Sequence, residues 1–156
     1  MNKIKLIIGL GNPDPKYENT YHNVGRLFID FWGKGVKSEV FMNKSGEFVK
    51  EQVKKNKIKP ENLLIVHDDS DIELGFYKLS FGRNSAGHRG VQNIIDQLKT
   101  KNFWRLRIGI RPHSALQASR SKPRPTADEL VLKSISPANK KRLEEVFKMA
   151  TKEVLP

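Results

Sequence analysis

His22 and Asp68 are the residues whose types best suit acid–base chemistry. His22 comes just before an apolar segment with helical spacing. A neutral imidazole, with a pKa of about 6.5, can take a proton from water at neutral pH, so His22 could act as a general base. Asp68 follows the apolar run 62–67. Its carboxylate could accept the other ring N–H of His22 and fix the tautomer of the base.

Both residues also have simpler interpretations. A lone histidine is usually a surface or capping residue. Asp68, Asp69 and Asp71 could cap a turn or bind a cation, but alternating acids without further ligands make a poor metal site. We therefore expect no bound metal.

Two asparagines could serve the same chemistry. The amides of Asn12 and Asn43 could hold an attacking water and the carbonyl of an ester, as oxyanion stabilisation requires. Alternatively, Asn12 belongs to the turn before Pro13, and Asn43 caps a helix. Gly9 and Gly11 near this turn do not complete a dinucleotide fingerprint, because Asp14 occupies the third glycine position.

Strands that alternate with helices must position these side chains. Short apolar runs predict strands over 3–10, 36–42, 62–67, 75–81 and 103–110, with residues 68–71 in an acidic turn. Helical spacing predicts helices around 24–31, 45–56 and 91–98, and a last helix with Ser136 as N-cap and Pro137 at its first position. Such an order implies a mainly parallel sheet that binds ligands beyond the carboxyl ends of its strands.

Composition narrows the class of protein. A chain of 156 residues fits one domain, 1–156. There is no cysteine, and no run approaches the roughly 20 apolar residues of a membrane helix, so we expect a soluble cytoplasmic protein. A net charge of +12 favours a nucleic-acid partner, although excess lysine could equally serve solubility. Residues 111–125 are predicted to form a mobile basic loop.

Five motifs in order give the sequence a family resemblance. They are GLGNP at 9–13 followed by Tyr17 and His22, FMNKSG at 41–46, VHDDSDIELG at 66–75, SAGHRG at 85–90 and FWRLRIGI at 103–110. Together they resemble the signature of bacterial-type peptidyl-tRNA hydrolases. The resemblance implies a single three-layer α/β/α domain around a twisted, mostly parallel mixed sheet, without a cofactor. It also implies a monomer that hydrolyses the ester between peptide and tRNA.

Site residues follow from the same resemblance. It assigns catalysis to four polar side chains: His22, Asp68, Asn12 and Asn43. It assigns binding of peptidyl-tRNA, including the phosphate backbone near the acceptor end, to Tyr17, Met42, Arg107 and the position occupied by Arg89. Lys78, on the strand next to Arg107, could also contact backbone phosphate.

The chain departs from the family pattern at several places. Arg89 stands where the family has an asparagine after the histidine, and Arg cannot accept a hydrogen bond. Tyr21 replaces an arginine, Asp14 a glycine and Ser80 a second lysine. The segment between His22 and Asn43 is short for the family, which predicts a reduced sheet in a shortened, divergent member.

Two other functions fit the sequence. A non-catalytic RNA-binding relative would keep the fold and the basic surface, and its RNA affinity would fall steeply with salt. A hydrolase of small acyl esters would not need the charge of +12.

Overall fold

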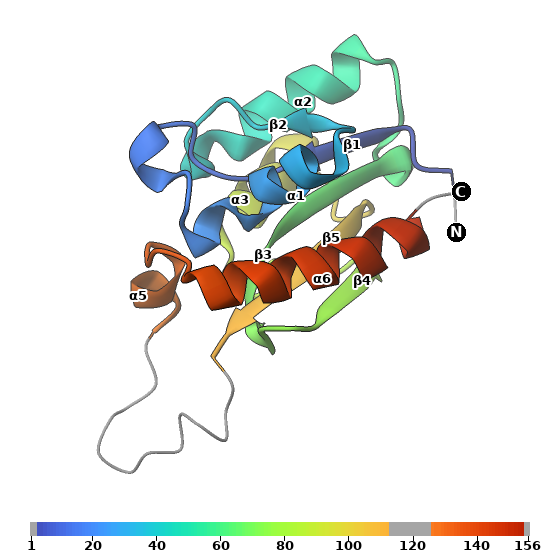
Figure 1. The fold of residues 1–156 in the computed structure, drawn as a ribbon. Coiled ribbons are helices and arrows are strands. Elements are labelled where there is room, and N and C mark those ends of the chain that lie inside the picture. The colour runs from blue at the N-terminus through green and yellow to red at the C-terminus, as the bar shows by residue number, and fades with distance from the viewer. Residues whose placement is uncertain (1–2, 113–125, 155–156) are drawn as a thin grey trace.

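The computed structural model describes residues 3–112 and 126–154. Five strands form one sheet in the order β2-β1-β3-β5-β4 (Figure 1). The neighbouring pairs among β2 (Val36–Lys37), β1 (Leu6–Gly9), β3 (Leu63–Glu73) and β5 (Trp104–Arg111) are parallel. Only β4 (Tyr77–Phe81) runs antiparallel, along β5.

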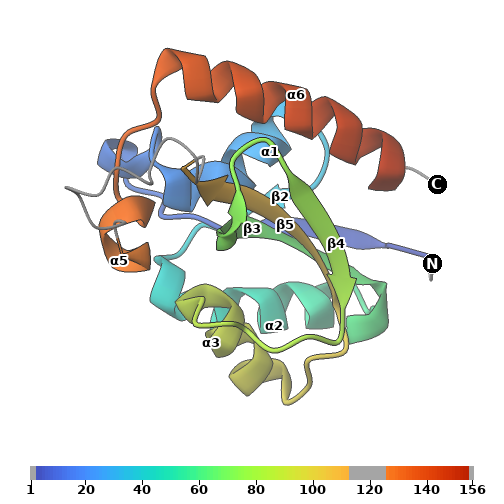
Figure 2. The same ribbon diagram turned by 90° about the horizontal axis from the view of Figure 1, so that it is seen from below.

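Helices cover both faces of the sheet. Figure 2 shows α1 (Val24–Trp32) and α6 (Pro137–Val154) on one side, with α2 (Ser45–Lys55) and α3 (Arg89–Leu98) on the other. Alternate side chains of β3 pack against the helices on opposite faces of the sheet, because successive side chains of a strand point to opposite faces. Leu64 and Val66 pack with α1 and α6, whereas Leu63 and Ile65 pack with α2 and α3. The predicted three-layer α/β/α fold is confirmed.

Two glycines bring α1 against the sheet. A Cβ built on Gly25 would lie 2.2 Å from the carbonyl oxygen of Val66, and one on Gly9 would lie 2.2 Å from the oxygen of Gly25. Side chains at these positions would push the helix away from the strands. Because no side chains intervene, α1 begins close to the sheet, and the preceding turn η2 (Tyr21–Asn23) places His22 near the end of β1 and beside Asp68 of β3.

The strands predicted over 62–67 and 36–42 differ in length from those in the structure. The acidic residues do not form a turn after residue 67, because β3 continues through them to Glu73 and pairs with β5, including a register shift between Asp69 and Glu73. The partner strand thus overrides the turn propensity of the acids. The strand predicted over 36–42 is only Val36–Lys37, after which the chain reaches η3 (Met42–Lys44).

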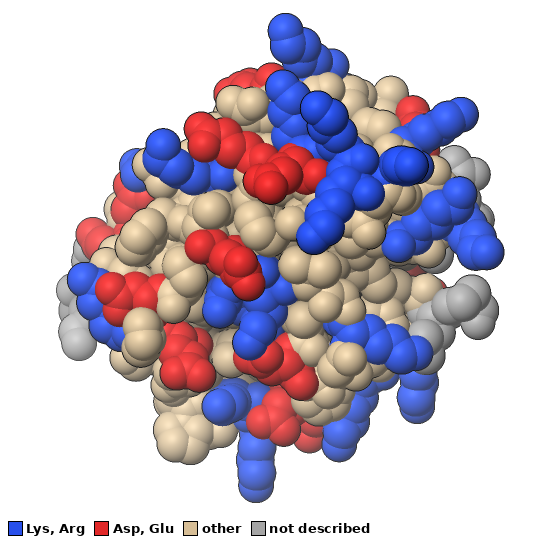
Figure 3. Space-filling model, turned by 90° about the horizontal axis from the view of Figure 1, so that it is seen from above, with Lys and Arg blue, Asp and Glu red and all other residues tan. Residues whose placement is uncertain are grey.

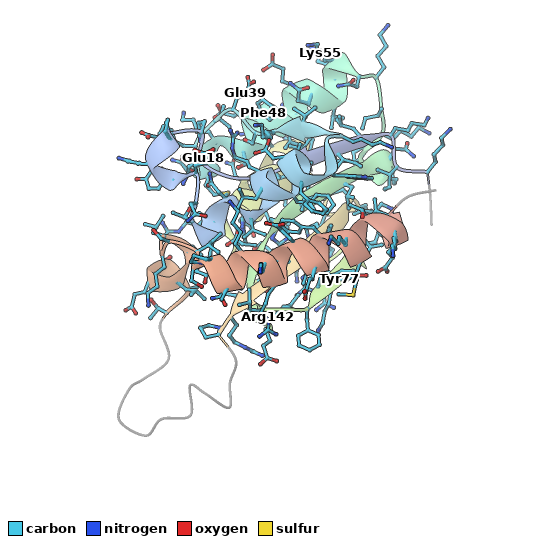
Figure 4. The ribbon with its side chains drawn as sticks, in the orientation of Figure 1. Glu18, Glu39, Phe48, Lys55, Tyr77 and Arg142 are labelled. Atoms are coloured by element: carbon cyan, nitrogen blue, oxygen red, sulfur yellow. The ribbon has the colours of Figure 1, made fainter. Side chains whose placement is uncertain are left out.

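The last helix crosses the turn between β3 and β4. Ser136 caps α6 as predicted, since its Oγ accepts the N–H of Asn139 at 3.2 Å. Arg142 donates to the carbonyl of Leu74, and Tyr77 donates to a Glu153 oxygen at 2.6 Å (Figure 4). Burial and the Glu153 contact raise the pKa of Tyr77 to about 12. These contacts fix α6 over the antiparallel edge.

Among the described residues, one short α-helix was not predicted. α5 spans Ala127–Val131, and the Oγ1 of Thr126 accepts the N–H of Glu129 at its start. The sequence TADE at 126–129 has the spacing of a capping box, which was the available signal. Within the predicted basic loop 111–125, residues 113–125 lie outside the described part of the chain. None of the described helices is long and apolar enough to cross a membrane.

Candidate active site

A pocket of about 560 Å³ opens beside the acidic part of β3. Its walls come from five places: the turn after β1, the turns η2 and η3, the start of α3, and α5. The lining residues are Asn12, His22, Phe41, Met42, Asn43, Asp68, Asp69, Ser70, Ser85, Ala86, Gly87, His88, Arg89, Ala127, Asp128, Val131 and Leu132. The predicted catalytic residues His22, Asp68, Asn12 and Asn43 therefore share one pocket.

His22 is held by a buried carboxylate. Its Nδ1 lies 3.0 Å from both oxygens of Asp68, and the two side chains are 14% and 2% exposed. An ionised carboxylate only accepts hydrogen bonds, so Nδ1 carries the proton. The proton-free Nε2 of neutral His22 is left available to the pocket. This is the arrangement of an oriented general base.

Asp68 has a second histidine partner that sequence reasoning missed. The Nε2 of His88 lies 2.9 Å from Oδ1 of Asp68, and its Nδ1 accepts the N–H of Val91 at 3.2 Å as the cap of α3. Both nitrogens of His88 are therefore engaged, Nε2 as a donor to Asp68 and Nδ1 as an acceptor from Val91. The only signal in the sequence was its place before Arg89 in the fourth motif.

Electrostatics separate the roles of these groups. Burial opposes the charged form of Asp68, but the charges and hydrogen bonds of His22 and His88 outweigh it and hold the Asp68 pKa far below its usual range. Burial likewise opposes protonation of His22, yet the charge and hydrogen bond of Asp68 raise the His22 pKa above 6.5. Asp68 thus stays ionised and favours a proton on His22.

The same cluster does not suit a metal. One ligand atom from each of His22, Asp68 and His88 lies within 4.8 Å of the others. Coordination through Nε2 would move the proton of His88 to Nδ1. Because Nδ1 already accepts the N–H of Val91, this would break the cap of α3. The donor set fits a hydrogen-bonded network better.

Asn12 and Met42 form one wall of the pocket. The backbone of Asn12 exchanges two hydrogen bonds of 2.8 Å with the side chain of Asn23. Its Oδ1 accepts the N–H of Met42, also at 2.8 Å, so the Nδ2 amide remains to face a ligand. The neighbouring Asn43 is exposed, and α2 has Lys44 rather than Asn43 as its N-cap. Asn43 is therefore not a helix cap.

An ion pair crosses the pocket between α3 and α5. The guanidinium of Arg89 lies 3.6 Å from the carboxylate of Asp128, and both side chains are largely exposed. The Arg89 charge works against protonation of His22, and the Asp128 charge favours it. Arg89 therefore lies close enough to act on a charged group at His22.

Three predicted binding residues lie outside the pocket lining. Tyr17 belongs to the turn η1 (Pro15–Tyr17) and packs under Lys16. Arg107 is buried and donates to Asp69 at 2.8 Å, so contact with a phosphate would compete with this ion pair. Lys78 is exposed and is the register partner of Arg107 on β4.

Known proteins match this chain in sequence. A family model for peptidyl-tRNA hydrolase matches residues 6–35 and 34–155. The peptidyl-tRNA hydrolase of Aquifex aeolicus is 34% identical over 175 residues, covering 96% of this chain and 87% of that protein. Its counterpart in Haemophilus influenzae strain PittGG is 38% identical over 181 residues, covering 97% and 88%.

Solved structures match the fold. A peptidyl-tRNA hydrolase structure from Acinetobacter baumannii superposes with a TM-score of 0.82 at 28% identity, covering 99% of this chain and 88% of that one. The family model breaks at residues 34–35, directly before β2. Both sequence alignments are longer than the 156 residues of this chain. Both alignments therefore include positions that this chain lacks, and the break in the family model lies between His22 and Asn43, where the chain is predicted to be short.

Proposed function

Because the chain belongs to the peptidyl-tRNA hydrolase family, we propose that it cleaves the ester of peptidyl-tRNA with His22 as the general base. The observation that carries this assignment is the contact of 3.0 Å from Nδ1 of His22 to the buried Asp68 carboxylate. That contact fixes the tautomer with its free nitrogen on the pocket side.

The chemistry then runs in two steps. Nε2 of His22 takes a proton from a water molecule, whose oxygen attacks the ester carbon. The amides of Asn12 and Asn43 stabilise the negative oxygen of the tetrahedral intermediate. As the intermediate collapses, the bond to the ribose oxygen breaks and the imidazolium returns its proton to that oxygen. The products are a free peptide and tRNA.

The pocket offers different surfaces to the two parts of the substrate. Phe41, Val131 and Leu132 give it an apolar side, which suits the side chains of a peptide. The ion pair between Arg89 and Asp128 is exposed and weak. Arg89 therefore leaves Asp128 and binds a substrate phosphate or the ester oxygen instead. Met42 packs against Gly90 and shapes the base of the site.

A longer-range attraction acts on the tRNA. The net charge is +12, and Figure 3 shows many Lys and Arg side chains projecting from one face, with acidic side chains between them. Exposed Lys78 contacts the tRNA backbone, and Tyr17 approaches the acceptor end from beside the pocket. Arg107 contacts phosphate only if its ion pair with Asp69 breaks.

The protein acts as a cytoplasmic monomer.

A single-substitution experiment tests the assignment. We would compare wild type, His22→Ala and the exposed α6 variant Lys148→Ala on an N-blocked aminoacyl-tRNA, following release of tRNA. His22→Ala should lose about 100-fold or more of kcat, as expected for removal of a general base. Its tRNA affinity and the activity of Lys148→Ala should be close to wild type. Full turnover by a folded His22→Ala protein would rule out this base.

A further inference from the structure

Arg105 is a buried cation behind the pocket. Its side chain belongs to β5 and is 3% exposed. One terminal nitrogen lies 3.3 Å from Nε2 of His67, and the other donates to the carbonyl of Asn84 at 2.7 Å. In the described part of the chain, no carboxylate forms an ion pair with Arg105. Burial of a cation without such a pair is costly, so this placement needs a reason.

His67 receives one of those bonds. It is 1% exposed, and its Nδ1 lies 2.7 Å from the backbone oxygen of Asp68. A carbonyl only accepts, so Nδ1 carries the proton and Nε2 accepts from Arg105. Burial, followed by the charges of His88 and Arg105, keeps the pKa of His67 well below its usual value. His67 is therefore a neutral imidazole with a fixed tautomer.

The His67 ring supports the Asp68 cluster directly. Its centroid lies 4.7 Å from that of His88, and His88 lies 5.2 Å from His22. The ring of His88 therefore packs against both other imidazoles, and the carboxylate of Asp68 contacts His22 and His88. His67 holds the backbone of Asp68 and packs against His88.

We propose that His67, locked by Arg105, is a positioning residue that aims the Asp68 carboxylate at His22 and confines the catalytic proton to His22. This role rests on the proposed function of His22. His67 touches neither substrate nor reacting atoms, because it is buried behind Asp68 and does not line the pocket.

The network distinguishes the three imidazoles chemically. Protonation of His67 would place an N–H against the Arg105 guanidinium, and protonation of His88 would place one against the N–H of Val91. Only His22 has a free nitrogen beside the carboxylate. Without Arg105, His67 could adopt the other tautomer and release the Asp68 carbonyl, which would let the carboxylate rotate away from the base.

The test uses the full chain with substitutions of His67 and of Arg105, the two residues of the buried contact. His67→Leu removes both polar contacts, His67→Asn keeps a donor near Nδ1, and Arg105→Met removes the cation but keeps length. Trp104→Phe is the matched control on β5, because the indole nitrogen of Trp104 has no hydrogen-bond partner among the described residues. Thermal unfolding and circular dichroism select the variants that remain folded.

The measurements are kcat, KM and the pH profile of kcat/KM on an N-blocked aminoacyl-tRNA. His67→Leu and Arg105→Met should lower kcat by about 10- to 100-fold, the usual effect of losing a group that orients a functional histidine, with KM nearly unchanged. The midpoint of the acid limb should move down in both, since His22 loses part of its contact with Asp68. His67→Asn should recover part of the loss, and Trp104→Phe should match wild type.

Two results would overturn the inference. One is folded His67→Leu and Arg105→Met proteins with wild-type kcat and an unmoved acid limb. The other is a loss of kcat equalled by Trp104→Phe, which would show a general effect of disturbing β5. Neither result bears on His22→Ala, so failure of the positioning role can be separated from failure of the proposed base.

Discussion

At His22, the direction of the Asp68 contact decides which nitrogen can act on a substrate. Asp68 accepts from two imidazoles, but only His22 also presents a free nitrogen to the pocket. The second nitrogen of His88, Nδ1, accepts the N–H of Val91 and caps α3. A proton taken from water therefore has one stable location, and the buried carboxylate that stabilises it remains ionised throughout.

Removal of the Asp68 charge should slow the reaction and shift its pH dependence. Asp68→Asn leaves a neutral amide where the carboxylate stood, so the base loses both its fixed tautomer and the charge that raises its pKa. We expect kcat to fall by about 100-fold or more. The midpoint of the acid limb should move to lower pH, because burial then acts on His22 without compensation. An acid limb that moves upward would contradict this electrostatic assignment.

Arg89 should have the opposite electrostatic effect. Its charge lowers the pKa of His22, so Arg89→Asn should move the acid limb of kcat/KM to higher pH. Asp128→Asn provides the matched change of opposite sign and should move the limb to lower pH. Both effects should shrink with added salt, because the two side chains are largely exposed. Shifts of the same sign in the two variants would argue against a charge effect.

At the scale of elements, two capped helices differ in their relation to the pocket. Thr126 caps α5, which contributes Asp128 and Val131 to the pocket lining, whereas Ser136 caps α6 on the helical layer next to α1.

Thr126→Ala and Ser136→Ala should therefore separate stability from substrate binding. Each should cost about 0.5–2 kcal/mol of folding or local helix stability. Only Thr126→Ala should raise KM, because α5 is short and cannot hold the pocket wall once its first turn frays. Urea unfolding and steady-state kinetics on both variants check this. Equal KM values would show that α5 takes no part in binding.

The sequence predicted the elements better than their ends. Apolar periodicity predicted β1, α1 and α3 because their buried faces follow it closely. β3 extends beyond residue 67 because β5 pairs with Asp68, Asp69 and Glu73, which local turn propensity does not reveal. α5 was missed because five residues carry too little periodicity, although its cap was visible.

The site was predictable where a motif fixed a residue and unpredictable where packing did. His22, Asp68, Asn12 and Asn43 come together in one pocket because β1 ends beside Val66 of β3, two residues before Asp68. Nothing in the sequence indicated that Asp69 would neutralise Arg107, or that His88 would share Asp68. Both contacts join residues from separate elements.

At the scale of the whole molecule, charge should govern the capture of tRNA. With a net charge of +12, kcat/KM for an aminoacyl-tRNA substrate should fall steeply with salt, by a log–log slope of roughly 0.7–0.9 per phosphate contact. A small N-blocked amino-acid ester has no phosphates and serves as the matched substrate, whose hydrolysis should depend little on salt. Parallel salt curves for the two substrates would exclude an electrostatic contribution from the tRNA backbone.

The role of His22 as the general base is tested by comparing the titration of His22 with the pH dependence of activity in the same protein. NMR of the imidazole signals, assigned with His22→Ala, gives the pKa of His22. The pH profile of kcat/KM on an N-blocked aminoacyl-tRNA gives the ionisation that controls turnover. If His22 is the general base, both midpoints should coincide above 6.5 and both should move down together in Asp68→Asn. Activity that stays constant while His22 titrates would contradict a general base at this residue.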